Sequence, residues 1–344
     1  MNNSKVTMIV DLQFGSTGKG LIAGYLAERD EHDTVINANM PNAGHTYIND
    51  VGRTWIHKVI PNGIVSPKLK NVMIGPQSVF SLEQLAKEVY NSADLLSGKT
   101  VWIHEGATLL HSDHKAFEQA NLSGISSTMQ GSAAASIAKM LRNPKEDYQA
   151  KNSADLKEFA DNIKVSNGVM VQVIDNRKWI LLLKASDNIL AEAAQGYSLG
   201  LNAGFWPYCT SRDCVPARFM SDMGIPLSML GIVVGTARVH PIRVGSTTDG
   251  YSGDVYDDQD ELTWEDVGQK PELTTVTQRQ RRIFSFSHQQ IEEAITACEP
   301  DEIFLNFVNY DIEKGTAIAK RYKEQVRYIG FGAARCDIED LGIG

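Results

Sequence analysis

The chain has 344 residues, of which 42% are hydrophobic and 22% charged, so it can bury the core of one large α/β unit. Its formal net charge of −9 excludes the broadly basic surface that non-specific nucleic-acid binding requires. The apolar run near the start is too short for a signal peptide, and no later stretch approaches the roughly 20 apolar residues of a membrane span. We therefore expect a cytoplasmic globular protein with neither nucleic acid nor membrane as a partner.

Short runs rich in β-branched residues recur along the chain between helical stretches. Continuous apolar runs of this kind are typical of parallel strands whose sheet is covered by helices on both faces. The sequence therefore predicts an α/β fold with a central, mostly parallel sheet flanked by helices, in a single domain over residues 1–344 with insertions. The predicted strands lie at 6–10 and begin near Thr34, Asn71, Val101, Gly168, Leu230, Ile303 and Val326.

Two of the expected helices have clear start signals. Ser81 with Gln84, and Ser287 with Gln290, have the spacing of a capping box, in which each side chain bonds the backbone N–H of the other residue. Residues 247–278 are instead acidic and rich in turn residues. Because this segment also contains aromatic residues, we predict a long excursion from the domain rather than plain disorder. These aromatic residues are Tyr251, Tyr256 and Trp264.

The four cysteines are scattered and form no Cys-x-x-Cys pair. This spacing favours reduced core thiols over a disulfide framework or a zinc site. The cysteines are Cys209, Cys214, Cys298 and Cys336.

The segment QFGSTGKG at 13–20 joins the first strand to an apolar-periodic helix. It matches neither the Walker A pattern nor the dinucleotide fingerprint, because Gln13 and Gly20 stand where Walker A needs a glycine and a hydroxyl residue. Its glycines and Lys19 nevertheless offer backbone N–H groups and one ammonium at a helix N-terminus, which suits a di- or triphosphate. The alternative is a glycine-rich turn that serves only close packing.

Two further segments, NAGHT at 42–46 and HKVIPNGI at 57–64, follow this loop. In this order the three segments resemble the adenylosuccinate synthetase family, whose cellular members carry Gln-Trp-Gly-Asp-Glu-Gly-Lys-Gly, Asn-Ala-Gly-His-Thr and His-Leu-Ile-Pro-Ser-Gly-Ile. A weaker resemblance continues over nearly the whole chain, although this chain is shorter than cellular members. It includes GISSTMQG at 124–131, the segment 192–211, RVGS at 243–246 and TVTQRQRR at 275–282.

The resemblance implies a P-loop-NTPase-like fold and a two-step ligase reaction. The family phosphorylates the 6-oxygen of a purine monophosphate with a nucleoside triphosphate and Mg²⁺, and the amine of aspartate then displaces phosphate. Such chemistry needs a proton donor at the transferring phosphoryl group and a charge-neutralising cation. The resemblance makes His45 that donor, a role that suits the usual pKa of histidine. Taken alone, His45 could also be a buried structural imidazole, and we take His57 as structural.

Position 16 departs from the family pattern. Cellular members have an aspartate there, which takes the purine N1 proton and binds Mg²⁺, whereas the hydroxyl of Ser16 has no comparable basicity. The change allows an inactive enzyme, a weaker one, or one with a changed substrate, and retention of the rest of the loop and of His45 argues against inactivity. A shorter neutral side chain leaves room for the 2-amino group of guanine. The pattern resembles the phage-type branch of the family, which acts on dGMP in the host cytoplasm to make the 2-aminoadenine nucleotide.

The triphosphate-binding segment departs as well. The family recognises the guanine of GTP with Thr-Lys-Leu-Asp, and FLNFVNYD at 304–311 places Phe307 and Asn309 at the lysine and aspartate positions. Asparagine can pair with both the donor and the acceptor of adenine, so we predict ATP rather than GTP. The alternative is that this segment is only a buried strand end. GFGAAR at 330–335 would complete the base pocket.

Arg279, Arg281 and Arg282 form the densest positive cluster of an acidic chain. Planar guanidinium groups suit the two carboxylates of aspartate and a phosphate edge. The alternative is a solvated basic face or a nucleic-acid patch, but the resemblance and the net charge favour aspartate. The resemblance also places Arg142 where the family has an arginine donated by the other subunit, which implies a homodimer.

The resemblance thus implies a complete set of site residues. The expected catalytic residues are Ser16 and His45, and the expected Mg²⁺ ligands are Ser16 and Gly44. The ATP-binding residues are Gly15, Thr17, Gly18, Lys19, Gly20, Leu21, Gly44, His45, Thr46, Arg281, Phe307, Asn309, Gly330, Phe331 and Gly332. The dGMP-binding residues are Ser16, Asn42, Ser127, Thr128, Arg142, Gln195, Thr210, Val244 and Arg279, and the aspartate-binding residues are Thr277, Gln278, Arg279 and Arg281.

Three functional hypotheses stay open at this point. The first is a ligase that joins dGMP and aspartate at the expense of ATP, and the second is an adenylosuccinate synthetase that uses IMP with an unusual base. The third is a nucleotide-binding or kinase module that does not use aspartate. The arginine cluster together with NAGHT disfavours the third, because a simple kinase needs neither.

Overall fold

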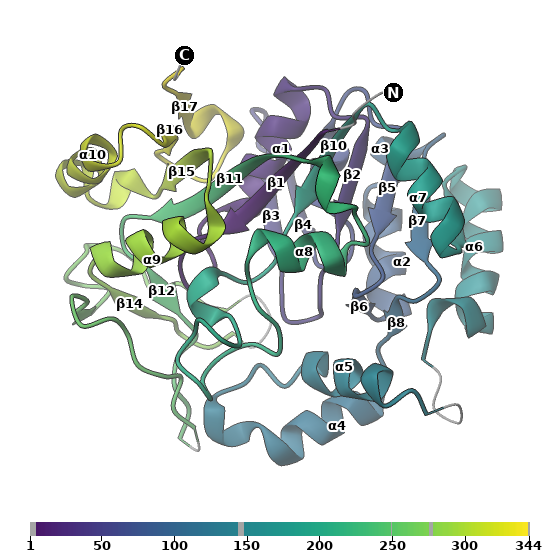
Figure 1. The fold of residues 1–344 in the computed structure, drawn as a ribbon, viewed down its shortest axis with the longest axis horizontal. Helices are drawn as coiled ribbons and strands as arrows, with labels where there is room; N and C mark the ends of the chain where they lie inside the picture. The colour runs from purple at the N-terminus through teal and green to yellow at the C-terminus, as the bar shows by residue number, and fades with distance from the viewer. Residues whose placement is uncertain (1–4, 144–147, 249, 275–277, 343–344) are drawn as a thin grey trace.

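The computed structural model describes residues 5–143, 148–248, 250–274 and 278–342. A sheet of ten strands in the order β17-β16-β15-β11-β1-β10-β2-β5-β7-β9 forms its centre (Figure 1). All neighbouring pairs are parallel except β16 and β17 at one edge, so the predicted mostly parallel α/β sheet is confirmed. Its strands are β1 (Lys5–Asp11), β2 (Thr34–Asn37), β5 (Asn71–Ile74), β7 (Thr100–His104), β9 (Met170–Ile174), β10 (Asn188–Glu192), β11 (Leu230–Arg238), β15 (Glu302–Asn306), β16 (Val326–Gly330) and β17 (Ile338–Asp340).

One central strand was not predicted. Strand β10 pairs with both β1 and β2, yet only Ile189, Leu190 and Ala191 are apolar in it. An apolar run this short, with a polar residue at each end, gives too weak a periodicity to identify a strand from the sequence. The polar residue at its carboxyl end, Glu192, later proves to belong to the candidate site.

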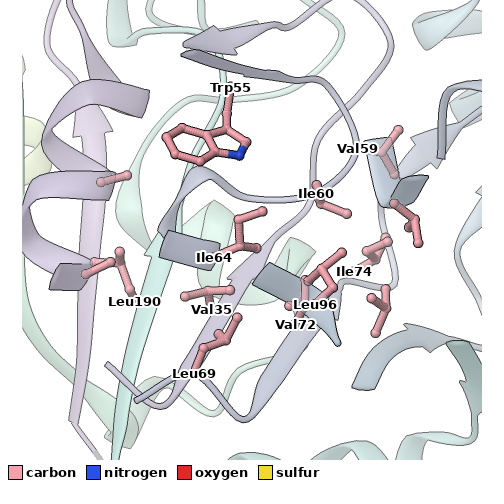
Figure 2. Packing of buried hydrophobic residues seen from close by; sticks show 14 of the residues in the cluster. Val35, Trp55, Val59, Ile60, Ile64, Leu69, Val72, Ile74, Leu96 and Leu190 are labelled. Carbon is pink, nitrogen blue, oxygen red and sulfur yellow. The ribbon is translucent and has the colours of Figure 1, made fainter. Parts of the chain in front are cut away.

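Alternate residues of the sheet pack into two separate cores. In β1, Met8 and Val10 belong to the core on one face and Ile9 to the core on the other, as the two-residue period of a strand requires. Figure 2 shows part of the core that contains Ile9, in which Trp55 and Ile64 lie on the same side of the sheet as Val35. Apolar residues of helices cover both faces, each contributing roughly 1.5–3 kcal/mol when fully buried. Helices α1 (Lys19–Arg29), α2 (Leu82–Asn91) and α6 (Ala154–Asn167) belong to the core of Ile9, and α7 (Asn176–Ala185), α8 (Pro216–Asp222), α9 (His288–Cys298) and α10 (Ile312–Arg321) to that of Met8.

The two predicted helix starts are confirmed, but the reciprocal half of each capping box is not formed. Ser81 accepts a hydrogen bond from the N–H of Gln84 at 3.2 Å, and Ser287 from that of Gln290 at 2.9 Å. The Gln84 side chain bonds Glu88 instead, and the Gln290 side chain bonds Ser198. Each glutamine has a nearby acceptor within the fold, so it does not turn back to the cap.

Smaller elements lie outside the ten-stranded sheet. The excursion is ordered where the structure describes it, because Tyr256 and Trp264 are buried. It contributes to a small antiparallel sheet in the order β12-β14-β13, and β3 and β4 form a separate hairpin. Figure 1 shows α4 and α5 at the bottom of the view, away from the main sheet. The bounds are β3 (His45–Ile48), β4 (Thr54–His57), β6 (Val79–Phe80), β8 (Thr108–Leu109), α3 (Ala93–Leu96), α4 (Ser112–Asn121), α5 (Ser132–Leu141), β12 (Ile242–Arg243), β13 (Glu261–Leu262) and β14 (Arg282–Phe284).

All four cysteines are free, as predicted, but they are not all core residues. Cys214 and Cys298 are buried, Cys209 is partly buried and Cys336 is exposed. Within the described ranges, none of the helices combines the length and the apolar character needed to cross a membrane.

Candidate active site

Four adjacent strands, β15, β11, β1 and β10, end in polar residues at the same edge of the sheet. Their last residues are Asn306, Arg238, Asp11 and Glu192, all buried. Ligands of open α/β sheets bind in the crevice outside the carboxyl ends of the strands. A cavity of about 380 Å³ lies here, lined by the loop after β1, the start of β3, and residues after β15.

Many residues predicted from the sequence line this cavity. Ser16, Asn42, His45 and Gln195 lie around it together with much of the glycine-rich loop, and Arg281 and Phe307 come from the far end of the chain. The predicted residues in the lining are Gly15, Ser16, Gly18, Lys19, Gly20, Leu21, Asn42, Gly44, His45, Thr46, Thr128, Gln195, Val244, Arg281, Phe307 and Gly332.

Two glycines of the loop are required by their surroundings. Gly18 has a φ of 97°, and a Cβ on it would lie 2.3 Å from the Asn306 amide nitrogen. A Cβ on Gly20 would lie 2.8 Å from the carbonyl oxygen of Thr46 and 2.9 Å from the Cβ of His45. Glycine at these positions therefore lets the start of α1 approach β3, which brings the loop and His45 to one cavity.

Asp11 organises the interior of the loop. Its Oδ1 accepts hydrogen bonds from the N–H groups of Gln13 at 2.9 Å and Gly15 at 3.2 Å, and its Oδ2 from the Lys19 ammonium at 2.8 Å. We expected the N–H of Gly15 and the Lys19 ammonium to be exposed for a ligand, but the carboxylate at the end of β1 engages both. An ammonium has three N–H donors, so the ion pair with Asp11 leaves Lys19 two for a phosphate at the cavity.

His45 is held by a carboxylate that the sequence analysis did not select. Its Nδ1 lies 2.6 Å from Oε1 of Glu192, and Oε2 of Glu192 accepts the N–H of Asn62 at 2.7 Å. The His45 side chain is only 10% exposed. Because a carboxylate can only accept, the proton of a neutral imidazole is fixed on Nδ1, which orients the ring and leaves Nε2 for chemistry. The partner strand places His57 opposite His45; it is buried, and its Nε2 bonds the Ser92 hydroxyl at 3.1 Å.

A second cavity of about 140 Å³ adjoins the first and shares Asn42, Thr128 and Gln195 with it. The Gln195 amide is oriented at both ends, since its nitrogen donates to Asn42 at 3.1 Å and its oxygen accepts from the buried Arg212 at 3.0 Å. Burial lowers the pKa of Arg212, although Asp222 beside it acts in the opposite direction. The cavity is rich in hydroxyl groups and includes the predicted Ser127, Thr128, Thr210 and Val244.

The three arginine side chains of the expected aspartate-binding segment lie in different surroundings. Arg281 lines the larger cavity, and burial lowers its pKa to about 10 while Glu272 beside it has the opposite effect. Arg279 lines neither cavity; its guanidinium donates to the carbonyl of Ser127 at 2.9 Å. Arg282 pairs with Glu261 and lies over Phe284. Of the three, only Arg281 is at the larger cavity in this structure.

Several predicted residues are not in the lining of either cavity. The hydroxyl of Thr17 bonds Asp11, so it faces inward. Asn309 is exposed, because β15 ends at Asn306 and Phe307, with a φ of 59°, turns the chain so that its own ring lines the cavity. The Asn309 side chain, which we predicted to contact adenine, therefore does not line the cavity. The other residues outside the lining are Arg142, Gln278, Arg279, Gly330 and Phe331, and Thr277 lies outside the described residues.

The donor groups fit a magnesium ion only in part. The described residues contain no group of three or more His, Cys, Asp or Glu side chains that could hold a metal ion. Ser16 and Gly44 line the cavity and offer a hydroxyl and a carbonyl oxygen, which are the hard ligands that Mg²⁺ accepts. Mg²⁺ is commonly bound through few protein groups together with substrate phosphates and water, so this sparse set fits a metal that arrives with a nucleotide.

Sequence reasoning missed the buried residues that orient the others. Asp11, Glu192 and Arg212 are next to predicted residues in sequence or space, and Glu192 begins the quoted segment 192–211. For Asp11 and Glu192 the available signal was a polar residue directly after an apolar run, which in a parallel sheet marks the edge where ligands bind. The hydrogen-bond partners themselves come from distant segments and leave no local pattern.

The fold and this cavity place the chain in a known class of ligases. The sequence pattern of the adenylosuccinate synthetase family matches residues 8–163 and 134–329, and the chain belongs to this family. The N6-succino-2-amino-2'-deoxyadenylate synthase of Vibrio phage phiVC8 is 53% identical over 346 residues, which are 97% of each chain.

Two solved structures share the fold. One is a succinoaminodeoxyadenylate synthetase from Cyanophage S-2L, bound to dGMP and to dATP as an energy donor. It matches with a TM-score of 0.88 and 35% identity, over 98% of this chain and 95% of its own. A fully ligated adenylosuccinate synthetase from Plasmodium falciparum matches with a TM-score of 0.76 over 97% of this chain and 99% of its own, but at 18% identity it supports the fold alone.

Proposed function

We propose that this chain condenses dGMP with L-aspartate, driven by ATP, to give N6-succino-2-amino-2'-deoxyadenylate, ADP and phosphate. The observation that carries the proposal is Ser16, which lines the cavity with His45 at the position where cellular members of the family have an aspartate. The similarity to phage enzymes of this activity supports it. The product would serve synthesis of 2-aminoadenine DNA in the cytoplasm of a phage-infected host.

In the first step, the 6-oxygen of the purine attacks the γ-phosphorus of the triphosphate, and the bond from that phosphorus to the β-bridging oxygen breaks. The glycine-rich loop and the two remaining donors of Lys19 would bind the phosphates at the start of α1. His45 would act as the imidazolium: its Nδ1–H donates to Glu192, which holds the ring in one orientation, and its Nε2–H would donate to the transferring phosphoryl group. Mg²⁺, held by Ser16, Gly44 and the phosphates, would neutralise charge on the transferring group.

In the second step, the amine of aspartate attacks the purine C6 and phosphate leaves with the former 6-oxygen. Arg281 is the cavity-lining cation that could bind a carboxylate of aspartate. Arg279 and Gln278 would join it only after Arg279 releases the carbonyl oxygens of Ser126 and Ser127. Thr277 completes the proposed aspartate set from the family resemblance.

The monophosphate of dGMP would bind in the smaller cavity. The hydroxyl groups of Ser132 and Ser211 there are buried without a hydrogen-bond partner among the described residues, which suits a cavity built for a polar ligand. The predicted Ser127, Thr128 and Thr210 supply further donors. Asn42 and the oriented Gln195 lie between the two cavities, where a purine joined to that phosphate would reach Ser16.

The energy donor we propose is ATP, with Phe307 as one wall of the base pocket. Phe307 and Gly332 line the larger cavity and not the hydroxyl-rich smaller one, and an aromatic ring there gives a stacking surface for a base. This surface does not distinguish adenine in ATP from adenine in dATP. Both nucleotides therefore belong in the assay.

We also propose a homodimer in which Arg142 acts in the partner's site. Arg142 is exposed at the end of α5 and lines no cavity of its own chain. Beside it, the α5 residues Ile137, Met140 and Leu141 are 42%, 67% and 68% exposed. An apolar helix face next to an unused arginine suits contact with a second copy. Mixing Arg142→Ala with the inactive His45→Asn should restore activity if the arginine acts in trans, because one site of the mixed dimer keeps both residues.

One competition assay tests the proposed reaction. The protein is incubated with ATP or dATP, Mg²⁺, aspartate, dGMP and IMP together, and products are identified by mass. A dominant succino adduct of dGMP is the expected result. A succino adduct of IMP would instead identify an ordinary adenylosuccinate synthetase, and nucleotide phosphorylation that does not respond to aspartate would identify a kinase.

A further inference from the structure

Arg238, at the carboxyl end of β11, joins segments of the site that are far apart in sequence. Its side chain is fully buried. It donates from Nη1 to the carbonyl oxygen of Ser16 at 3.1 Å and from Nη2 to Oε1 of Glu272 at 2.7 Å, and its guanidinium lies 3.9 Å from the centre of the Phe307 ring. The backbone of Arg238 is fixed in turn, because its N–H and carbonyl both bond the side chain of Gln13.

The contact with Ser16 matters because Ser16 has an unusual backbone. Its φ is 58°, in the left-handed region that residues other than glycine and asparagine seldom adopt. Such a conformation persists only when the surroundings enforce it, and strained residues of this kind concentrate at active sites. The guanidinium of Arg238 donates to the carbonyl of Ser16 and so supports this backbone conformation, which sets the direction of the Cα–Cβ bond that carries the hydroxyl.

Glu272 anchors Arg238 from the other side. It lies in the acidic excursion, lines the cavity, and also accepts the hydroxyl of Tyr310 at 3.2 Å. Burial alone would raise the pKa of Glu272, but Arg238 and Arg281 lower it below its usual value, which favours the carboxylate form. The excursion therefore supplies a carboxylate that keeps the planar guanidinium of Arg238 in one orientation. The ring of Phe307 covers one face of that guanidinium.

We propose that Arg238 is a positioning residue for the reaction: it holds the backbone of Ser16 in the left-handed conformation that places the serine hydroxyl at the purine. This inference rests on the proposed function of Ser16. Arg238 acts through Ser16, so its loss lowers the rate of the chemical step more than it weakens dGMP binding. An arginine that only stabilised the fold would lower the melting temperature without this difference.

Three arginine variants test the proposal. Arg238→Met removes the fork, and Arg238→Lys keeps the charge but cannot bond Ser16 and Glu272 as a planar fork. The control is Arg29→Met, since Arg29 also pairs with a carboxylate, Asp340, and lies over aromatic rings, yet lines neither cavity. We expect kcat to fall about 100-fold in Arg238→Met and about tenfold in Arg238→Lys. We expect the dissociation constant of dGMP, measured by calorimetry without ATP, to change less than about threefold.

A double variant separates positioning of Ser16 from neutralisation of Glu272. Arg238→Met leaves the Glu272 carboxylate without its main partner, which could itself disturb the cavity. If Arg238 acts through Ser16, the double variant Arg238→Met with Glu272→Leu keeps the low kcat of Arg238→Met. Recovery of kcat in the double variant, or an equal loss in Arg29→Met, would overturn the proposal. The proposed function is tested separately, by the mass of the product that the unaltered protein forms. The effect of the variants on kcat can be measured with whichever monophosphate proves to be the substrate.

Discussion

The contact between Glu192 and His45 gives the most direct prediction for catalysis. In Glu192→Gln the side chain keeps its shape and can still accept the N–H of Asn62. An amide nitrogen facing Nδ1 of His45 would, however, donate a hydrogen bond and favour the tautomer whose proton is on Nε2. If the amide turns the other way, its oxygen keeps Nδ1 protonated but the bond from Asn62 N–H then faces an amide donor. The first arrangement keeps both contacts but fixes the opposite tautomer, and the second loses the bond from Asn62. Neither amide carries the negative charge that stabilises a His45 imidazolium.

The expected loss follows from the contacts that change. The 2.6 Å bond between Nδ1 and Oε1 is charge-assisted and lies where Glu192 is 1% exposed, so water cannot replace it. Losing a preorganised partner of a catalytic imidazole costs on the order of 3–5 kcal/mol of transition-state stabilisation, or roughly 10²–10⁴ in kcat. Ground-state binding of the monophosphate does not use this contact, and its affinity should stay within about threefold of the starting value.

The assay compares Glu192→Gln with a matched control. Glu88, on α2, is likewise buried and lies outside both cavities. Its carboxylate accepts the N–H groups of Lys58, Val59 and Ile60 at 2.7–2.9 Å. Glu88→Gln should lower the melting temperature but leave kcat nearly unchanged. Single-turnover formation of ADP, with nucleotide and dGMP saturating, measures the chemical step. The reasoning is refuted if Glu192→Gln retains kcat within about threefold while His45→Asn is inactive, because His45 would then act without its carboxylate partner.

Four further changes are expected to have separate effects. His45→Asn should abolish phosphoryl transfer while dGMP still binds in calorimetry, and unchanged turnover would remove His45 from the mechanism. Arg281→Leu should raise the apparent KM for aspartate by about 100-fold, and an effect confined to ATP would contradict its assignment. Ser16→Asp should lower dGMP turnover relative to IMP, whereas equal dGMP activity would disprove the steric argument. Burial lowers the pKa of His240 to about 4, so the unfolded chain binds a proton on this residue more tightly than the folded chain does. Stability should therefore rise by about 3 kcal/mol between about pH 4 and 6.5, and His240→Leu should flatten this rise in denaturant titrations.

The main architecture was predictable because the apolar runs that form parallel strands are local in sequence. The eight predicted strands are all present, and the capping serines Ser81 and Ser287 start the expected helices. Strand β10 was missed because its apolar run has only three residues. The sequence could not show that it pairs with β1 and β2, since that pairing joins segments separated by more than a hundred residues.

The candidate site was predictable for residues in short contiguous motifs and less so for those that depend on the path of the chain. The glycine-rich loop and NAGHT line the cavity as expected. Asn309 does not, because the turn at Phe307 could not be inferred from the residue types around it. Glu192 and Arg238 were not selected, since a single polar residue at a strand end acquires a role only through partners brought by other strands.

The structure also explains why the serine at position 16 is not compensated by another carboxylate of the loop. Asp11 is close in sequence, but it is 1% exposed and its two oxygens accept bonds from Gln13, Gly15, Thr17 and Lys19. Asp11 is not in the lining of the larger cavity, and among the described residues that are, the one acidic side chain is Glu272, which is paired with Arg238. Neither carboxylate is available as a base at the purine. The proposed role of Ser16 therefore predicts that a carboxylate at position 16 restores a base for IMP at the expense of the space for the 2-amino group of guanine, which is the outcome that Ser16→Asp tests.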